Sequence, residues 1–421
     1  MTRIRMFKFA LMMTLVSMLF VSLVSVGLAS EKLVFAVRGG LEDEVNLIRE
    51  EWGRRFEELN PGVEVEMLHI PMQGYYDAIR VQIIGGVHID VLWMGMFYPR
   101  YIDILHPLDD LAENGKLPEM IPGALDHGRS QGVLLAIPYA INVHTVMYNQ
   151  DMFYEAGLSD PSDDWTWDDA FEKARRMTRE APGEDEVDVY GMGFYWPHMV
   201  WGISGELFSP DGKEILIDNP VTISYAQLWS DFYSGKAGVQ GYPVGNTLNN
   251  FLNQTNAMVN RPTGNIRNFR NDATFDWDVI GWPYFEVGGE RYRNTFLSPE
   301  AWVVPTTSQN PELAKEFISF ILQPEQLGEH VTGGAAVPAV MELVLDDFLR
   351  QPVPSNIGAF VEAIGYAGPQ YYQHPAYDLY GETLMRGDLV SSLWAGEVAA
   401  SSAVPEIARM INAALEEWYE E

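Results

Sequence analysis

The sequence contains no cysteine. This absence excludes disulfide bonds, thiolate metal sites, a catalytic cysteine and the attachment of a lipid to a cysteine. Basic residues are also scarce: 27 Lys and Arg stand against 59 Asp and Glu, which gives a formal net charge of −32. A surface of this charge repels phosphate backbones and anionic headgroups, so we expect no nucleic-acid partner and no peripheral membrane attachment.

The common catalytic and metal-binding signatures are missing as well. The sequence has no Gly-x-Ser-x-Gly elbow, no Walker glycine–lysine loop and no His-Glu-x-x-His pair among its 8 histidines. Acidic residues are abundant, and sequence alone does not exclude a carboxylate pair that hydrolyses glycosides. We therefore expect no metal, no cofactor and no enzyme, with a carbohydrate-active enzyme kept as an alternative.

The N-terminus has the pattern of a secretory signal peptide. Three basic residues precede an apolar run from Phe9 to Leu28, which ends at the small residues Gly27 and Ala29. The run is also long enough to span a membrane, so an uncleaved anchor is the alternative. We predict that residues 1–29 are a cleaved signal peptide and that the mature protein is periplasmic, without a lipid anchor.

The first part of the mature chain alternates strand and helix patterns. A chain of 421 residues, 47% of them hydrophobic, is long enough for two globular domains. Alternating strand–helix units predict a parallel α/β domain, in which ligands bind at the carboxyl ends of the strands. Two such ends are Arg38-Gly39-Gly40 and Trp93-Met94-Gly95. The strands are expected at 32–37, 63–67 and 89–93, and the helices at 42–59 and 73–84.

A second organising stretch lies between residues 134 and 177. Two apolar runs, 134–137 and 141–148, are separated by Pro138, which has no N–H to donate. This predicts that the strand ladder breaks at Pro138 and that the chain passes from one sheet to another. Further on, Thr166 and Asp169 form a capping-box pattern before a helix. Its apolar stripe is Trp167, Phe171, Ala174 and Met177.

These segments carry a resemblance to a known family. The run PYAINVHTVMYNQDMFYEAGL at 138–158, followed by TWDDAFEKARRMT at 166–178, resembles the crossover segment of family 1 extracellular solute-binding proteins. Those proteins are the sugar-binding receptors of ABC importers. Further similar segments are Ala257-Met258 and the helix start at 310–317, so the resemblance extends over most of the mature chain, with 340–390 the weakest part.

The resemblance implies a class II periplasmic-binding-protein fold: two α/β lobes, each a sheet flanked by helices, with a hinge between them. The N-terminal lobe would comprise 30–139 and 303–337, and the C-terminal lobe 140–302 and 338–421. A mono- or oligosaccharide would bind in the cleft as the hinge closes. We expect a monomer that docks on the permease subunits of an ABC transporter. The alternatives are a secreted glycosidase or lyase with an aromatic cleft, and an exported carbohydrate adhesin.

Carbohydrate recognition requires aromatic rings for flat C–H faces and planar polar side chains for hydroxyls. Large aromatic residues usually pack in cores, so each tryptophan also has a purely structural interpretation. Asn142 stands where maltose-binding relatives use an acid, and Arg261 stands where they often carry an aromatic residue; an arginine there suggests a sugar with an anionic group. The predicted carbohydrate-binding residues are Arg38, Gly39, Trp93, Asn142, Trp196, Trp201, Arg261, Trp282, Glu300 and Trp302.

Overall fold

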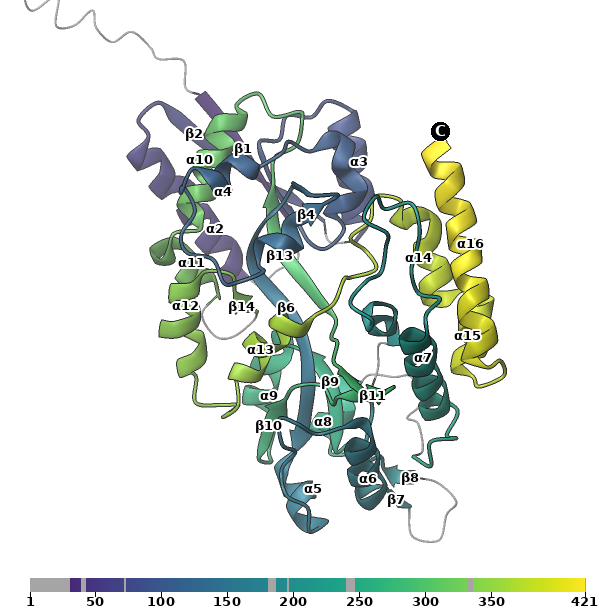
Figure 1. Ribbon diagram of the computed structural model, residues 1–421. Helices are drawn as coiled ribbons and strands as arrows, with labels where there is room; N and C mark the ends of the chain where they lie inside the picture. The colour runs from purple at the N-terminus through teal and green to yellow at the C-terminus, as the bar shows by residue number, and fades with distance from the viewer. Residues whose placement is uncertain are drawn as a thin grey trace, which may run out of the picture.

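The chain folds into two α/β lobes joined by strands that run from one lobe into the other (Figure 1). The computed structural model describes residues 31–38, 43–71, 73–180, 187–194, 197–239, 247–331 and 336–420. Within these residues, eight strands belong to one sheet, and β6 contacts β9, β10, β13 and β14. The proposed signal peptide lies outside the described residues.

The predicted strand–helix alternation of the first lobe is confirmed. β1 pairs in parallel with both β2 and β3, so the carboxyl ends of β1 and β3 lie at the same edge of the sheet. The elements of this lobe are β1 (Glu31–Arg38), α2 (Asp43–Leu59), β2 (Val63–Ile70), α3 (Tyr75–Ile84), β3 (Val91–Met94), α10 (Pro311–Ile321) and α11 (Pro324–Val331).

The predicted break at Pro138 is wrong, because β6 (Ile137–Asn149) continues through it as one strand. β6 pairs antiparallel with β13 (Leu297–Val303), and the register shifts between Glu300, opposite Ala140, and Ala301, opposite Pro138. Tyr139 is therefore an extra residue on β6. A β-bulge of this kind lets the strand accommodate a proline locally without ending.

The second lobe is built on the other half of β6. There β9 (Met258–Pro262) and β10 (Trp277–Ile280) pair antiparallel with β6. The predicted capping box of α6 (Trp167–Met177) is confirmed: the Asp169 amide donates to Thr166 Oγ1 at 3.3 Å and the Thr166 amide donates to Asp169 Oδ2 at 2.8 Å. The stripe predicted for this helix is buried.

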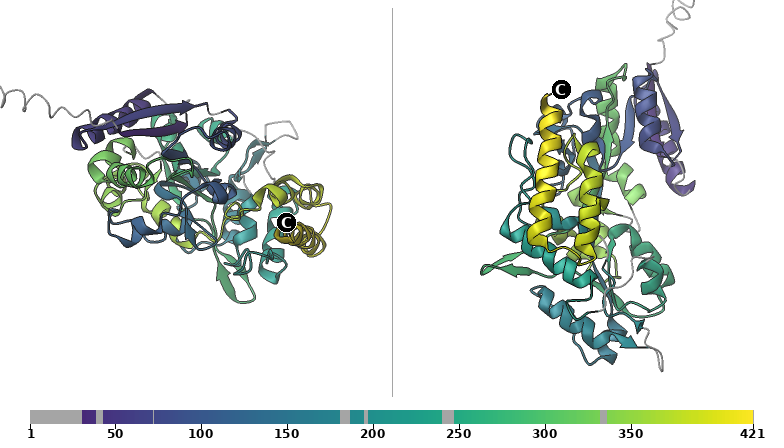
Figure 2. Two further views of the ribbon diagram at one scale, coloured as in Figure 1. Left: turned by 90° about the horizontal axis from the view of Figure 1, so that it is seen from above. Right: turned by 90° about the vertical axis from the view of Figure 1, so that its right-hand side faces the viewer.

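The remaining elements complete both lobes. α14 (Tyr377–Arg386), α15 (Asp388–Trp394) and α16 (Ala400–Glu420) pack together along one side of the molecule, as the right-hand view of Figure 2 shows. The others are η1 (Tyr98–Ile104), α4 (Asp109–Glu113), η2 (Leu125–Gly128), β4 (Arg129–Ser130), β5 (Val133–Leu134), α5 (Gln150–Glu155), β7 (Arg179–Glu180), β8 (Val187–Val189), η3 (Pro197–Gly202), α7 (Pro220–Tyr233), α8 (Thr247–Leu252), η4 (Thr263–Asn265), α9 (Ile266–Asp272), β11 (Phe285–Val287), β12 (Glu290–Tyr292), β14 (Val337–Pro338), α12 (Met341–Asp346), η5 (Phe348–Arg350) and α13 (Gly358–Tyr366).

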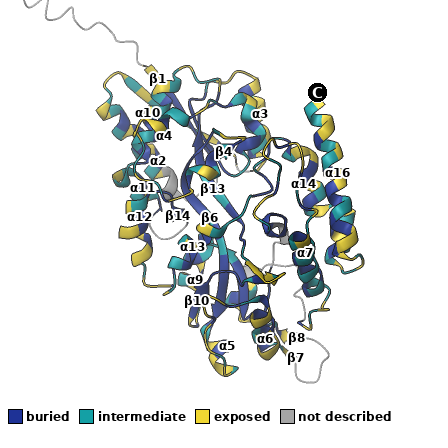
Figure 3. Cartoon of the chain, in the orientation of Figure 1, coloured by how far each residue is buried: buried dark blue, intermediate teal, exposed yellow. Residues whose placement is uncertain are grey.

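Each lobe has its own hydrophobic core. One cluster of buried side chains draws on residues 33–140 and 301–343, around β1, β3 and β13. Two further clusters lie mainly on the other half of β6 and under the C-terminal helices. The central strands are buried and the outer faces of the helices are exposed (Figure 3). The strands that cross between the lobes therefore run between separate cores.

Candidate carbohydrate-binding site

Four of the predicted site residues meet where the crossing strands leave the first lobe. Arg38 ends β1, Trp93 lies in β3, Asn142 lies in β6 and Glu300 lies in β13. β13 pairs with β3 on one side and β6 on the other, which brings these strands together. We call these four residues, together with Arg49 and Tyr139, the crossing-strand cluster.

Glu300 is the centre of the cluster. Its Oε2 accepts a hydrogen bond from Trp93 Nε1 at 3.0 Å, and its Oε1 accepts one from Asn142 Nδ2 at 3.3 Å. Asn142 Oδ1 in turn accepts from the Gly264 backbone N–H at 3.0 Å. This chain of hydrogen bonds runs from the first lobe through both crossing strands to η4 in the second lobe.

Burial and the neighbouring positive charges act on the ionisation of Glu300 in opposite directions. Burial raises the pKa of Glu300 above its usual value, and the positive charges of Arg38 and Arg49, together with its two hydrogen bonds, offset only part of this rise. The guanidinium carbon of Arg38 lies 4.3 Å from the centroid of the Trp93 ring. Arg38, Asn142 and Glu300 are all partly exposed, whereas Trp93 is almost fully buried beneath Arg38. The accessible face of the cluster therefore consists of polar groups.

A carboxylate, an amide and a guanidinium on one face are suited to binding hydroxyl groups. A carboxylate offers about four acceptor positions, of which two are used by Trp93 and Asn142. The remaining lone pairs of Glu300 can accept from ligand hydroxyls, and arginine N–H groups can donate to ligand oxygens. Among the described residues, no group of three or more His, Asp or Glu side chains is arranged to hold a metal ion.

Three predicted tryptophans lie in the hydrophobic cores instead. Trp302 and Trp201 are fully buried and Trp282 is 1% exposed. The indole of Trp201 donates to the Leu384 carbonyl at 3.3 Å, and that of Trp282 donates to the His144 carbonyl at 3.1 Å. Their rings pack on other aromatic side chains, which matches the structural interpretation left open for each tryptophan.

The remaining predicted residues are Arg261, Gly39 and Trp196. Arg261 lies on β9 opposite Thr145 and is partly buried. Burial lowers the pKa of His144 to about 3, with a further contribution from the charge of Arg261. Gly39 and Trp196 lie outside the described residues.

The sequence analysis missed Arg49 and Tyr139. Arg49 is 1% exposed, and the Tyr139 ring stacks on Trp302 with centroids 5.0 Å apart. Arg49 had a detectable signal, because it falls within the apolar stripe of its helix, three residues before Trp52. An arginine at such a position has to be buried or to distort the helix packing. Tyr139 is the extra residue of the bulge in β6, and the sequence alone does not reveal that bulge.

A second set of contacts joins the lobes beside this cluster. Phe97 of the first lobe meets Tyr377 of α14, with ring centroids 5.7 Å apart. Asp378 pairs with Arg100 of η1, and also with Arg80 of α3 at 3.8 Å. We call Arg80, Arg100 and Asp378 the lobe-bridging triad. Because they connect helices of different lobes, these pairs depend on how the lobes are oriented.

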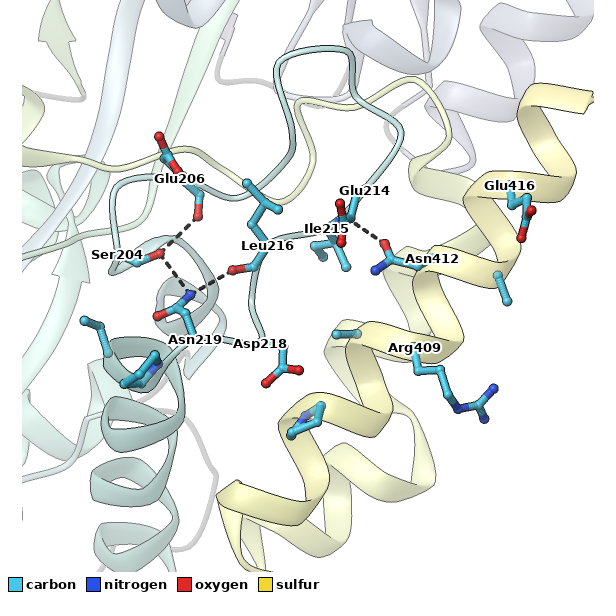
Figure 4. Close-up of a pocket in the computed structure, with 15 residues that line it drawn as sticks. Ser204, Glu206, Glu214, Ile215, Leu216, Asp218, Asn219, Arg409, Asn412 and Glu416 are labelled. Atoms are coloured by element: carbon cyan, nitrogen blue, oxygen red, sulfur yellow. Dashed lines mark hydrogen bonds between the residues drawn. The ribbon is translucent and has the colours of Figure 1, made fainter.

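A separate groove of about 900 Å³ lies on the second lobe, away from the crossing strands (Figure 4). It runs between the segment 204–221 and one face of α16. The Asn412 side chain bridges the two walls by accepting from the Ile215 amide at 2.7 Å. Carboxylates of exposed residues dominate its rim: Glu206, Glu214, Asp218 and Glu416. None of the predicted site residues lines it.

The sequence profile of the family described as bacterial extracellular solute-binding protein matches residues 40–327, which is more than half of the chain. The chain belongs to this family. The resemblance predicted from residues 138–178 is thereby confirmed, and so is the two-lobed fold. The family consists of binding proteins rather than enzymes.

Relatives of this solute-binding protein are distant in sequence and close in fold. The arabinooligosaccharide-binding protein of Bacillus subtilis is 24% identical over 339 residues, covering 74% of this chain and 76% of the relative. A cyclo/maltodextrin-binding protein solved with maltotetraose superposes with a TM-score of 0.74 at 17% identity, covering 92% of this chain and 97% of that one. A cyclic maltosyl-maltose-binding protein of Arthrobacter globiformis gives 0.73 at 17% identity, with 92% and 99% covered.

Family membership also bears on location. Extracellular solute-binding proteins act in the periplasm or outside the cell, and this coarse location holds for the present chain. Among the described residues, no helix is long and apolar enough to cross a membrane.

Proposed function

We propose that this protein is the carbohydrate-binding receptor of an ABC importer, which captures a mono- or oligosaccharide between its lobes by hinge closure. The observation that carries the proposal is the hydrogen-bonded Glu300 carboxylate, placed with Arg38 and Asn142 where the strands cross between the lobes. Relatives whose names specify arabinooligosaccharide and galactooligosaccharide binding support a sugar as the ligand. The permease subunits of the importer are the proposed partners of a monomeric receptor.

The proposed ligand contacts are the partly exposed members of the cluster. Arg38, Asn142 and Glu300 supply donors and acceptors for hydroxyls. Gly39, Trp196 and Arg261 remain proposed contacts from their sequence positions. Trp201, Trp282 and Trp302 are not proposed as contacts, because their rings are buried in the cores.

The proposed lobe boundaries follow the crossing strands. They divide the chain into 30–139 with 303–337 and 140–302 with 338–421. The separate hydrophobic clusters on the two halves of β6 support this division. Residues 1–29 are proposed as a cleaved signal peptide, on the basis of their basic start and apolar run, and the lack of cysteine supports a protein without a lipid anchor.

Thermal unfolding of the chain from residue 30 onward tests the proposal. Maltotetraose, arabinooligosaccharides, galactooligosaccharides and uronic acids are each titrated, and a sugar at 100 times its dissociation constant should stabilise the fold by about 2.7 kcal/mol. Binding must saturate at one sugar per chain, and the sugar must be recovered intact. A sugar cleaved during the assay would favour the glycosidase alternative, and no stabilisation by any of these sugars would contradict the proposed ligand class.

A further inference from the structure

α2 carries a buried arginine against the sheet that supports the proposed site. Arg49 is 1% exposed, and its guanidinium carbon lies 5.6 Å from the centroid of the Trp302 ring. Within the described part of the chain, its Nε and Nη1 atoms have no hydrogen-bond partner. A buried charge is costly unless an opposite charge compensates it. The presence of Arg49 therefore requires a nearby anion.

Glu300 is the carboxylate that faces Arg49. Side chains alternate along a strand, so Glu300 and Trp302 lie on the same face of β13, the face that Arg49 covers. Burial lowers the pKa of Arg49, whereas its interactions with the Tyr139 hydroxyl and the Glu300 carboxylate raise it. Ionised Arg49 and ionised Glu300 thus stabilise each other.

Other titratable groups surround this pair on every neighbouring element. Arg38 at the end of β1 faces Glu300 and also favours its ionised form. Tyr76 of α3 and Tyr139 of β6 face it with hydroxyls whose pKa values are raised, chiefly by burial. His330 of α11 faces Arg49, and burial lowers its pKa to about 3, so it is neutral at physiological pH. Arg38 and Arg49 are therefore the two cations that act on Glu300.

We propose that Arg49 is a positioning residue that keeps Glu300 ionised and oriented toward ligand hydroxyls, although it does not touch the ligand itself. The inference rests on the proposed carbohydrate-binding function. An ionised carboxylate accepts stronger hydrogen bonds than a neutral acid, and both of its oxygens remain acceptors. Arg38 lies on the accessible face and is available to the ligand, whereas Arg49 is enclosed and cannot reach the ligand.

The first test follows Glu300 without any sugar. The Trp93 indole N–H donates to Glu300 Oε2, so its NMR shift reports the ionisation of that carboxylate as pH is varied. In Arg49→Met the midpoint of this titration should move to higher pH, and in Arg49→Lys it should return toward the wild-type value. Glu300→Gln should abolish the titration. Arg54→Met, which removes an exposed arginine from the same helix, should leave it unchanged.

The second test measures affinity for maltotetraose and arabinotriose against pH. In Arg49→Met binding at pH 7 should weaken by about tenfold, the cost expected when one charge-assisted hydrogen bond becomes a neutral one. Arg49→Lys should recover part of this loss. If neither these two sugars nor the others titrated above bind the wild-type protein, the proposed ligand class fails, and the indole titration still decides the role of Arg49.

Stability gives a third test if Arg49→Met folds poorly. An uncompensated Glu300 would then be the cause, so the double variant Arg49→Met, Glu300→Gln should be more stable than Arg49→Met alone. A folded Arg49→Met variant with an unchanged titration midpoint would overturn the inference. So would a double variant that is no more stable than the single one.

Discussion

Replacing Asp378 by asparagine should shift the orientation of the two lobes. The substitution keeps the shape of the side chain and removes its charge, so the pairs of the lobe-bridging triad with Arg80 and Arg100 lose their attraction. The Phe97–Tyr377 ring contact remains. Because these ion pairs join different lobes, their loss acts on lobe orientation rather than on either core.

The magnitude follows from the exposure of the side chains. Asp378 is 44% exposed, and its partners Arg100 and Arg80 are 22% and 54% exposed. Exposed pairs are worth about 0.2–1 kcal/mol each, and the more enclosed pair with Arg100 should contribute more. A total loss of about 1 kcal/mol would lower the population of this lobe arrangement about fivefold relative to more open ones. Raising the ionic strength should have the same effect on the wild-type protein.

The lack of cysteine makes the measurement direct. Cysteines introduced at Leu59 in the first lobe and Tyr154 in the second, both exposed, can be spin-labelled without side reactions. Asp378→Asn should broaden the distance distribution toward longer values while the melting temperature changes little. Asp346→Asn is a matched control, because its ion pair with Arg350 lies within one segment of the chain. Identical distance distributions for Asp378→Asn and wild type would refute the reasoning.

Two further predictions concern stability. Trp302→Ala should lower the free energy of unfolding by about 3–5 kcal/mol, because it leaves a cavity in the core between Phe35 and Tyr139. Urea unfolding measures this loss, and an almost unchanged midpoint would contradict the assignment of Trp302 to the core. Burial lowers the pKa of His330 to about 3 from an ordinary value of 6.5, so its contribution to stability is complete above pH 6.5 and is lost as pH falls toward 3. The gap in stability between wild type and His330→Asn should therefore shrink from pH 7 to pH 4.5, and a constant gap would contradict this assignment.

Much of the fold was predictable from local patterns. The strand–helix alternation of the first lobe and the capping box at Thr166 both depend on neighbouring residues, and both are present. Pro138 was misjudged because its effect depends on a partner strand far away in sequence. A bulge opposite β13 accommodates it, and the bulge residue is set by tertiary pairing.

The candidate site was only partly predictable for a related reason. Strand ends identified Arg38 and Trp93, and Asn142 and Glu300 were also among the predicted residues. The structure brings these four together. Sequence does not distinguish a tryptophan that lines a cleft from one that fills a core. The burial of Trp302 in the core could therefore be recognised only in the structure. Arg49 can be recognised in the sequence as a charged residue inside an apolar helix stripe, but it was not predicted to support the site.

The continuity of β6 has a consequence for how the chain folds. The first lobe completes its sheet only when β13 inserts between β3 and β6, and β13 lies far along the chain from both. Until that segment is available, β3 and β6 present unpaired edges, and such edges are prone to pair with other chains. Contacts at this sequence separation also slow folding. Neither lobe should therefore fold cleanly when expressed alone, and a chain truncated before β13 should aggregate.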